Sequence, residues 1–135
     1  MVHYEEHGIS TQKRTEWLDI TSQVEKSIRL SNVQNGICMV SSLHTTAAIT
    51  LNENADPDVG RDFFYKMNQL ITKDPAFNHI EGNSDSHIKS SLVGFSAQVP
   101  VLKGKLVLGT WQSLYFCEFD GPRSGRKFSV TIIGE

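Results

Sequence analysis

A chain of 135 residues is long enough for one domain with its own hydrophobic core, so we expect residues 1–135 to form a single unit. With 39% hydrophobic and 21% charged residues, the composition is that of an ordinary soluble globular protein, and a net charge of −2 gives no basic surface for nucleic acid. No apolar run approaches the roughly 20 residues of a membrane span, and the first residues lack a secretory signal. Cys38 and Cys117 lie in apolar runs outside any Cys/His pattern, which indicates buried free thiols in a cytoplasmic protein.

Alternation and short apolar runs predict strands in both halves of the chain. The expected strands are residues 2–11, 37–43, 47–51, 97–102, 106–119 and 127–133. Turns at Lys103–Lys105 and Asp120–Gly125 separate the last three strands. Because the strands dominate and do not alternate regularly with helices, they favour an α+β fold with a largely antiparallel sheet over a doubly wound parallel fold.

Two or three helices are expected between these strands. The capping-box spacing of Ser22-Gln23-Val24-Glu25 predicts the start of the first helix. The second is the clearest, because Asp56 can cap it and Pro57 suits its first helical position. A short third helix is expected around residues 87–92, where Gly94 closes it.

The segment from His44 to Pro57 carries more polar chemistry than a strand and a helix start require. It places a histidine, two amides and two carboxylates around one short apolar run, although Asn52–Asp56 also suits an ordinary polar turn. In an extended strand His44 and Asn52 share one face, but about 3.3 Å per residue puts them about 26 Å apart. One small ligand cannot touch both, so either the strand bends or two subunits share a site; we favour the second.

Three histidines are candidates for chemistry: His44, His79 and His87. A neutral imidazole can bind a metal ion or act as a base near neutral pH. The sequence spacings between these histidines match no compact zinc motif, however, and His79 by itself is typical of an ordinary loop residue. His87 has the stronger context, because a helix that begins near it would point backbone amides at an anion, with Lys89 and Ser90 nearby. A phosphate or pyrophosphate would suit that place.

The C-terminal third adds an amide and two arginines. Trp111-Gln112 can serve core packing and one hydrogen bond, and taken alone it decides nothing. Arg123 and Arg126 follow a Gly-Pro turn and have acidic neighbours. The planar arginine fork suits carboxylate or phosphate, whereas ion pairs on a protein surface are common and contribute little.

Taken together and in order, the motifs resemble those of the YjbQ-like family over essentially the whole chain. The matching motifs are His-Thr-Thr-Ala-Ala-Ile-Thr-Leu-Asn-Glu-Asn-Ala-Asp-Pro at 44–57, Ser-His-Ile-Lys-Ser-Ser-Leu-Val-Gly at 86–94, Pro-Val-Leu-Lys-Gly at 100–104, Gly-Thr-Trp-Gln at 109–112 and the arginine-containing tail ending in Gly134-Glu135. Two features depart from part of the family. The loop before His87 is shorter than in some relatives and lacks their proline, and the turn at Asp120–Arg123 matches only a subset.

The resemblance implies a small cytoplasmic protein of α+β fold with a β-sandwich-like core, packed as a homotrimer. Some members are assigned a secondary thiamine-phosphate synthase activity, which joins a hydroxymethylpyrimidine pyrophosphate to a thiazole phosphate. The expected partner is therefore a small phosphorylated molecule bound between subunits, with a divalent metal ion, magnesium or zinc, as cofactor. The alternatives are a metal- or small-ligand-binding protein and an enzyme that handles phosphate esters.

Roles for individual residues follow from the matched motifs. The expected catalytic residues are His44, Glu53, Asp56 and His87. The expected substrate- and phosphate-binding residues are Thr45, Asn52, Lys89, Ser90, Gln112 and Arg126. The expected metal ligands are His44, His79 and His87. Such a reaction needs little covalent chemistry, because the enzyme must mainly hold two phosphorylated substrates and neutralise the departing pyrophosphate.

Overall fold

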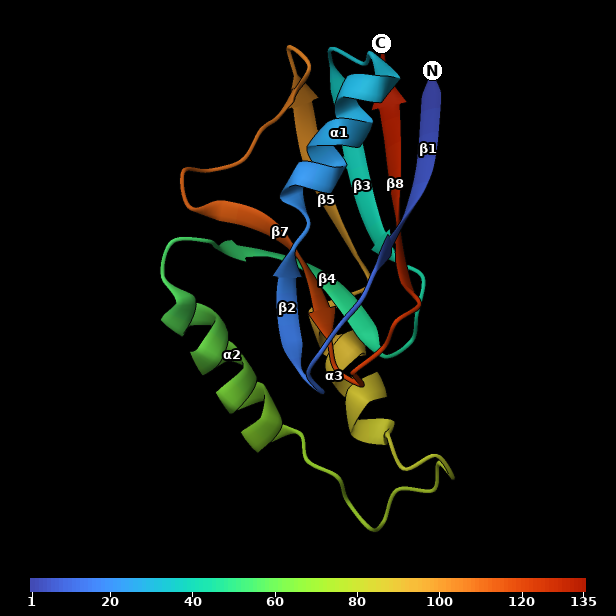
Figure 1. Ribbon diagram of the computed structural model, residues 1–135, viewed down its shortest axis with the longest axis vertical. Helices are drawn as coiled ribbons and strands as arrows, with labels where there is room; N and C mark the ends of the chain where they lie inside the picture. Colours follow the sequence, from blue (N-terminus) through green and yellow to red (C-terminus); the bar gives the residue numbers. More distant parts are fainter.

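Two antiparallel sheets and three helices make up the fold (Figure 1). The computed structural model describes residues 1–135. The larger sheet has five strands in the order β1-β8-β3-β5-β6, and the smaller has three in the order β2-β7-β4. In chain order the elements are β1 (Val2–Ile9), β2 (Glu16–Asp19), α1 (Thr21–Ser31), β3 (Gly36–Ser42), β4 (Ala47–Glu53), α2 (Pro57–Leu70), α3 (Ser84–Val93), β5 (Ser96–Leu102), β6 (Lys105–Leu106), β7 (Gln112–Glu118) and β8 (Arg126–Gly134). The predicted α+β class with an antiparallel, sandwich-like core is confirmed, since every strand pairing is antiparallel.

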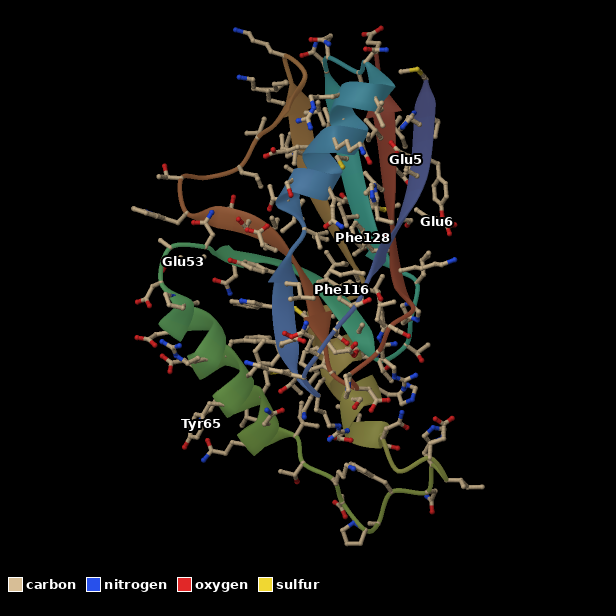
Figure 2. All side chains as sticks on the ribbon, viewed as in Figure 1. Glu5, Glu6, Glu53, Tyr65, Phe116 and Phe128 are labelled. Carbon is tan, nitrogen blue, oxygen red and sulfur yellow. The ribbon has the colours of Figure 1, made fainter.

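The hydrophobic core lies between the two sheets and beneath α1. Phe116 of β7 packs near Phe128 of β8, with ring centroids 6.3 Å apart (Figure 2). Helix α1 adds Val24 and Ile28 to the same cluster. Because these two residues are four positions apart, they share one face of the helix, which is the face it buries. Full burial of each large side chain contributes about 1.5–3 kcal/mol relative to exposure.

Helix α2 covers the other face of the smaller sheet through aromatic side chains. Trp17 of β2 stacks on Phe63 of α2 with ring centroids 5.2 Å apart, and on Tyr115 of β7 with centroids 4.4 Å apart. The helix comes this close because Gly60 has no side chain, since a Cβ atom there would lie 2.8 Å from the Trp17 indole nitrogen. None of the three helices is long and apolar enough to cross a membrane.

The helix boundaries agree with the prediction in part. Asp56 caps α2 as predicted, because its side chain accepts a hydrogen bond from the Asp58 backbone N–H at 2.8 Å. Gly94 follows the end of α3, also as predicted. The capping box predicted for α1 is wrong. That helix begins at Thr21 without a side-chain cap of its own, and Asp19 Oδ1 instead accepts from the Thr21 backbone N–H at 2.9 Å.

The strand predictions fail where pairing, and not the local pattern, defines the strand. The four-residue β2 was not expected, and it exists as a strand through its pairing with β7. The long strand predicted over 106–119 is two strands in different sheets, because β6 pairs with β5 whereas β7 pairs with β2 and β4. The strand expected over 47–51 is confirmed as β4, which begins at Ala47. The extended strand considered from His44 to Asn52 does not form, because His44 and Thr46 lie in the loop between β3 and β4.

Candidate functional site

A polar pocket of about 280 Å³ is lined by residues beside the N-terminal end of α3. Figure 1 shows α3 toward the lower end of the molecule. The walls of the pocket come from the β3–β4 loop, the connection between α2 and α3, the first turn of α3, the stretch between β7 and β8, and the start of β8. The lining residues, none of them hydrophobic, are His44, Thr45, Thr46, His79, Glu81, Asn83, His87, Arg123 and Arg126. This cavity, termed the histidine pocket below, brings together five predicted site residues that are far apart in the sequence: His44, Thr45, His79, His87 and Arg126.

Arg126 is held at the pocket wall by a buried ion pair with Glu118. The guanidinium donates from Nε to Glu118 Oε2 at 2.8 Å and from Nη2 to Thr46 Oγ1 at 2.8 Å. Glu118 also accepts hydrogen bonds from the Thr11 hydroxyl and the Asp120 backbone N–H. Burial raises the pKa of Glu118, but the hydrogen bonds from Arg126, the Asp120 backbone and Thr11 outweigh it, so the net pKa is lowered. The Arg126 charge is therefore balanced inside the protein, and its guanidinium is fixed in one orientation.

His44 presents a neutral imidazole whose Nε2 atom is already occupied. The Lys127 backbone N–H donates to Nε2 at 2.8 Å, so in the neutral ring Nε2 holds the lone pair and Nδ1 carries the proton. Burial lowers the pKa of His44, and the positive charge of Arg126 lowers it further. His44 can therefore donate a hydrogen bond through Nδ1. It could bind a metal ion through Nδ1 only if the proton moved to Nε2, where it would oppose the Lys127 N–H.

The other two predicted histidines lie edge to face beside the same pocket. The ring centroids of His79 and His87 are 5.2 Å apart with perpendicular planes, and His79 Nε2 lies 3.8 Å from Glu81 Oε1. No three side chains of the His, Cys, Asp and Glu types are grouped closely enough to hold a metal ion. In this conformation the three predicted ligands do not form a metal site, since the lone pair of His44 Nε2 already accepts a hydrogen bond from the Lys127 backbone N–H. A divalent metal ion therefore stays a prediction.

Asn83 and Arg123 are pocket residues that the predicted set omits. Asn83 Nδ2 donates to Asp120 Oδ2 at 2.7 Å, and Arg123 Nη2 donates to the same oxygen at 2.9 Å. The oxygen of the same amide, Asn83 Oδ1, is buried and has no hydrogen-bond partner. A buried acceptor without a donor costs about 1–3 kcal/mol, so a donor on a bound ligand would find a partner here. The one sequence signal for Asn83 is its place at the N-cap of α3.

Lys89 and Ser90 do not join the histidine pocket. Lys89 follows His87 by two residues, which is about 200° of helix rotation, so the two side chains leave α3 on opposite sides. Lys89 is 3% exposed, and its Nζ donates to Asn68 Oδ1 at 2.8 Å. The Ser90 hydroxyl is buried without a hydrogen-bond partner. The prediction that groups Lys89 with His87 therefore needs correction, because within one chain they line different cavities.

A second group of predicted residues lies at the end of β4 remote from the histidine pocket: Asn52, Glu53, Asp56 and Gln112. Strands β4 and β7 pair along their whole length, with Ala47 at one end and Glu53 opposite Gln112 at the other. Glu53 lies where the chain leaves β4 for α2 (Figure 2). Trp111, for which core packing was the expected role, is 60% exposed beside this group. One chain therefore does not bring this group to His44.

Comparisons with known proteins identify relatives that match this chain along most of its length. Residues 5–135 match the family described as "UPF0047 protein YjbQ-like". A UPF0047 protein of Methanocaldococcus jannaschii is 51% identical over 129 residues, which cover 96% of this chain and 93% of that protein. The UPF0047 protein YugU of Bacillus subtilis is 47% identical over 117 residues, or 86% of this chain and 89% of that protein.

Two crystal structures share the fold closely. A YbjQ-like protein of unknown function from Sulfolobus solfataricus has a TM-score of 0.95 and 36% identity, and the match covers 100% of this chain and 99% of that chain. A YjbQ/UPF0047 protein from Clostridium acetobutylicum has a TM-score of 0.92 and 48% identity, covering 96% and 99%. By sequence and by fold, this chain belongs to the YjbQ/UPF0047 family.

Proposed function

We propose that the histidine pocket binds a small phosphorylated molecule and that the chain is a thiamine-phosphate synthase-like transferase. One observation carries the proposal: three histidines and two arginines, from four separate segments, line a pocket that has no apolar side chain. Guanidinium and imidazole donors suit phosphate oxygens. The polar lining also suits a phosphate or pyrophosphate group better than an aromatic ring, which usually needs apolar walls.

The proposed reaction forms one bond, from the lone pair of the thiazole nitrogen, and breaks another. The thiazole nitrogen attacks the methylene carbon of the pyrimidine substrate, and the bond from that carbon to the pyrophosphate oxygen breaks. The electron pair of that bond leaves with pyrophosphate, so the site has to stabilise additional negative charge. Arg126 lines the pocket and keeps its Nη1 group outside the hydrogen bonds to Glu118 and Thr46, and His44 keeps its Nδ1–H, so both residues could donate to the departing pyrophosphate. Arg123 is half exposed and can turn from Asp120 toward the leaving group.

The remaining part of the proposed site comes from a neighbouring subunit of a homotrimer. The polar residues at the far end of β4 are separated from the histidine pocket within one chain. A cleft between subunits would place the far end of β4 from one subunit against the histidine pocket of the next. Glu53 and Asp56 would then offer carboxylates, which suit magnesium better than zinc. We also place this activity in the cytoplasm, where the free, buried Cys38 and Cys117 are in keeping with a reducing environment.

The test is synthesis of thiamine phosphate by the purified protein from the two phosphorylated precursors with magnesium. We expect His87→Ala and His44→Ala to lower turnover at least tenfold, because each removes a side chain that lines the pocket. His3→Ala is the matched control, since His3 lies on β1 and contacts Glu5 outside the pocket. Absence of turnover in the parent protein, or an equal loss in the control, would refute the synthase proposal.

A second candidate function is binding of an anionic small ligand without turnover. The hydrogen bond from the Lys127 N–H to His44 Nε2 favours this candidate. Because that bond occupies the lone pair of the ring, His44 can donate a hydrogen bond but is not available as a general base. Saturable binding of pyrophosphate without product formation would support this candidate. Release of phosphate from a panel of phosphate esters would point instead to an enzyme that handles phosphate esters.

A further inference from the structure

We propose that a second oxyanion site lies on the opposite side of α3, in a cavity lined by Arg14, Lys73 and Lys89, and that it takes a phosphate-type dianion. The cavity has a volume of about 320 Å³, and Asn68, Thr72 and Asp85 are also among its walls. Its residues come from the segment before β2, the end of α2, the connection that follows α2, and α3. It shares no residue with the histidine pocket.

Lys89 is the buried cation of this site. It is 3% exposed, yet it lines the cavity. Its ammonium group has three N–H donors, of which one is used at 2.8 Å by Asn68 Oδ1, and the nearest carboxylate oxygen, Asp85 Oδ2, is 3.6 Å away. Burial lowers the pKa of Lys89, Asp85 raises it and Arg14 lowers it further. A bound anion would supply the close acceptors that this buried ammonium lacks.

The charge balance of the cavity also favours an anion. Three cationic side chains, Arg14, Lys73 and Lys89, line it together with one carboxylate, Asp85. Arg14 Nη2 lies 3.4 Å from both oxygens of Asp85 and 3.7 Å from Asp120 Oδ1. These contacts are long for a charge-assisted pair, which is usually about 2.7–2.9 Å. The shortest contact of Arg14 Nη2 is a hydrogen bond donated to the Ser86 hydroxyl oxygen at 3.1 Å, so no close carboxylate holds the Arg14 charge. By contrast, Arg126 of the histidine pocket is bound at 2.8 Å to Glu118.

A phosphate-type dianion fits this set better than a single carboxylate. Two side-chain hydroxyls, from Thr15 and Thr72, stand beside the cations as further donors. A tetrahedral anion with several acceptor oxygens can use donors that approach from different directions, and the net positive charge of the walls matches a double negative charge. The site stands independently of the proposed function, because none of its residues takes part in the histidine pocket.

The experiment is a titration of the ¹⁵N-labelled full chain with inorganic phosphate, against chloride at equal ionic strength. We expect saturable shifts of the backbone amides of Asn68, Thr72 and Lys73. Lys89→Met should weaken this binding at least tenfold and Lys73→Gln severalfold, because each removes one cation from the cavity. Lys66→Gln is the matched control: it removes the same charge from α2 at an exposed lysine that bonds Gln69, and it should change the affinity less than twofold.

Two results would overturn the proposal. The first is the absence of saturable shifts at residues 68–73 in the parent protein. The second is equal affinity in Lys73→Gln and Lys66→Gln, since Lys73 lines the cavity and Lys66 does not. Lys73 is exposed, so Lys73→Gln still decides the question if Lys89→Met does not fold. Shifts at residues 44–46 report on the histidine pocket, so failure of one site is distinguishable from failure of the other.

Discussion

The buried pair of Glu118 and Arg126 is the contact on which the wall of the histidine pocket depends. Glu118→Gln would leave Arg126, which is 4% exposed, without a counter-ion, and breaking a buried pair in this way costs about 3–5 kcal/mol. We expect the free energy of unfolding in urea at pH 7 to fall by that amount. Glu25→Gln, at an exposed position of α1, is the control and should change it by less than about 0.5 kcal/mol. Equal effects of the two substitutions would contradict this account of Arg126.

The pKa of His44 gives a prediction with a definite sign. Burial and Arg126 hold this pKa below the ordinary value of 6.5. As the pH falls, the unfolded chain takes up the proton first, so stability from neutral His44 is present above pH 6.5 and is lost as the pH falls through the lower, folded pKa. We expect an NMR titration to give His44 a midpoint below 6.5, and His44→Gln to reduce the loss of unfolding free energy across that window. A midpoint at or above 6.5 would contradict the neutral ring bonded to Lys127.

At the level of elements, the distance between α2 and β2 depends on a single glycine. Gly60→Ala would place a Cβ atom 2.8 Å from the Trp17 indole nitrogen, which requires the helix or the indole to shift. Alanine favours a helix interior by about 1 kcal/mol over glycine, but overpacking costs about 1–3 kcal/mol. We expect a net loss of up to about 2 kcal/mol in the free energy of unfolding. Gly125→Ala, where no atom lies within 4 Å, should not show this loss, and a stabilised Gly60→Ala would mean that the helix does not sit against Trp17.

The helices and strands also show which sequence signals are sufficient to predict where an element begins and ends. The start of α2 is predictable because the Asp56 cap and the proline after it act locally. The short β2 is not predictable, because its four residues become a strand only through partners far along the chain on β7, such as Glu118 opposite Glu16. The break between β6 and β7 escapes prediction for the same reason. Both parts look like strands, and their membership of different sheets is a property of the whole fold.

At the scale of the whole molecule, the larger sheet leaves one face uncovered. Val2, Ile133 and Ile37 stand side by side across β1, β8 and β3, and they are 66%, 56% and 53% exposed. Covering such a row removes apolar surface from water, which favours assembly of several chains. We expect light scattering to give a mass three times that of the 15.1 kDa chain, and Ile37→Lys to reduce it. Ile80→Lys, at a fully exposed loop position, is the control. A parent protein that runs as a monomer would contradict the proposed homotrimer.

The grouping of the site residues is also a property of the whole molecule. The sequence identifies His44, His87 and Arg126 individually, because their motifs are distinctive. It cannot show that they meet, since the β3–β4 loop, the first turn of α3 and the start of β8 are adjacent only in the folded chain. The sequence groups Glu118 with Arg126 around one turn, where a surface ion pair is expected. It does not show that this pair is buried, because β7 and β8 lie in different sheets that meet only in the folded chain.

The most direct test of the proposed site is a titration of the labelled protein with pyrophosphate, followed at the backbone amides of residues 44–46 and 123–126. We expect saturable shifts at these amides, at least tenfold weaker binding in His87→Ala, and unchanged binding in His3→Ala. No saturable shift at these positions, or equal affinities in the two variants, would contradict the assignment of the histidine pocket as the site for a phosphorylated ligand.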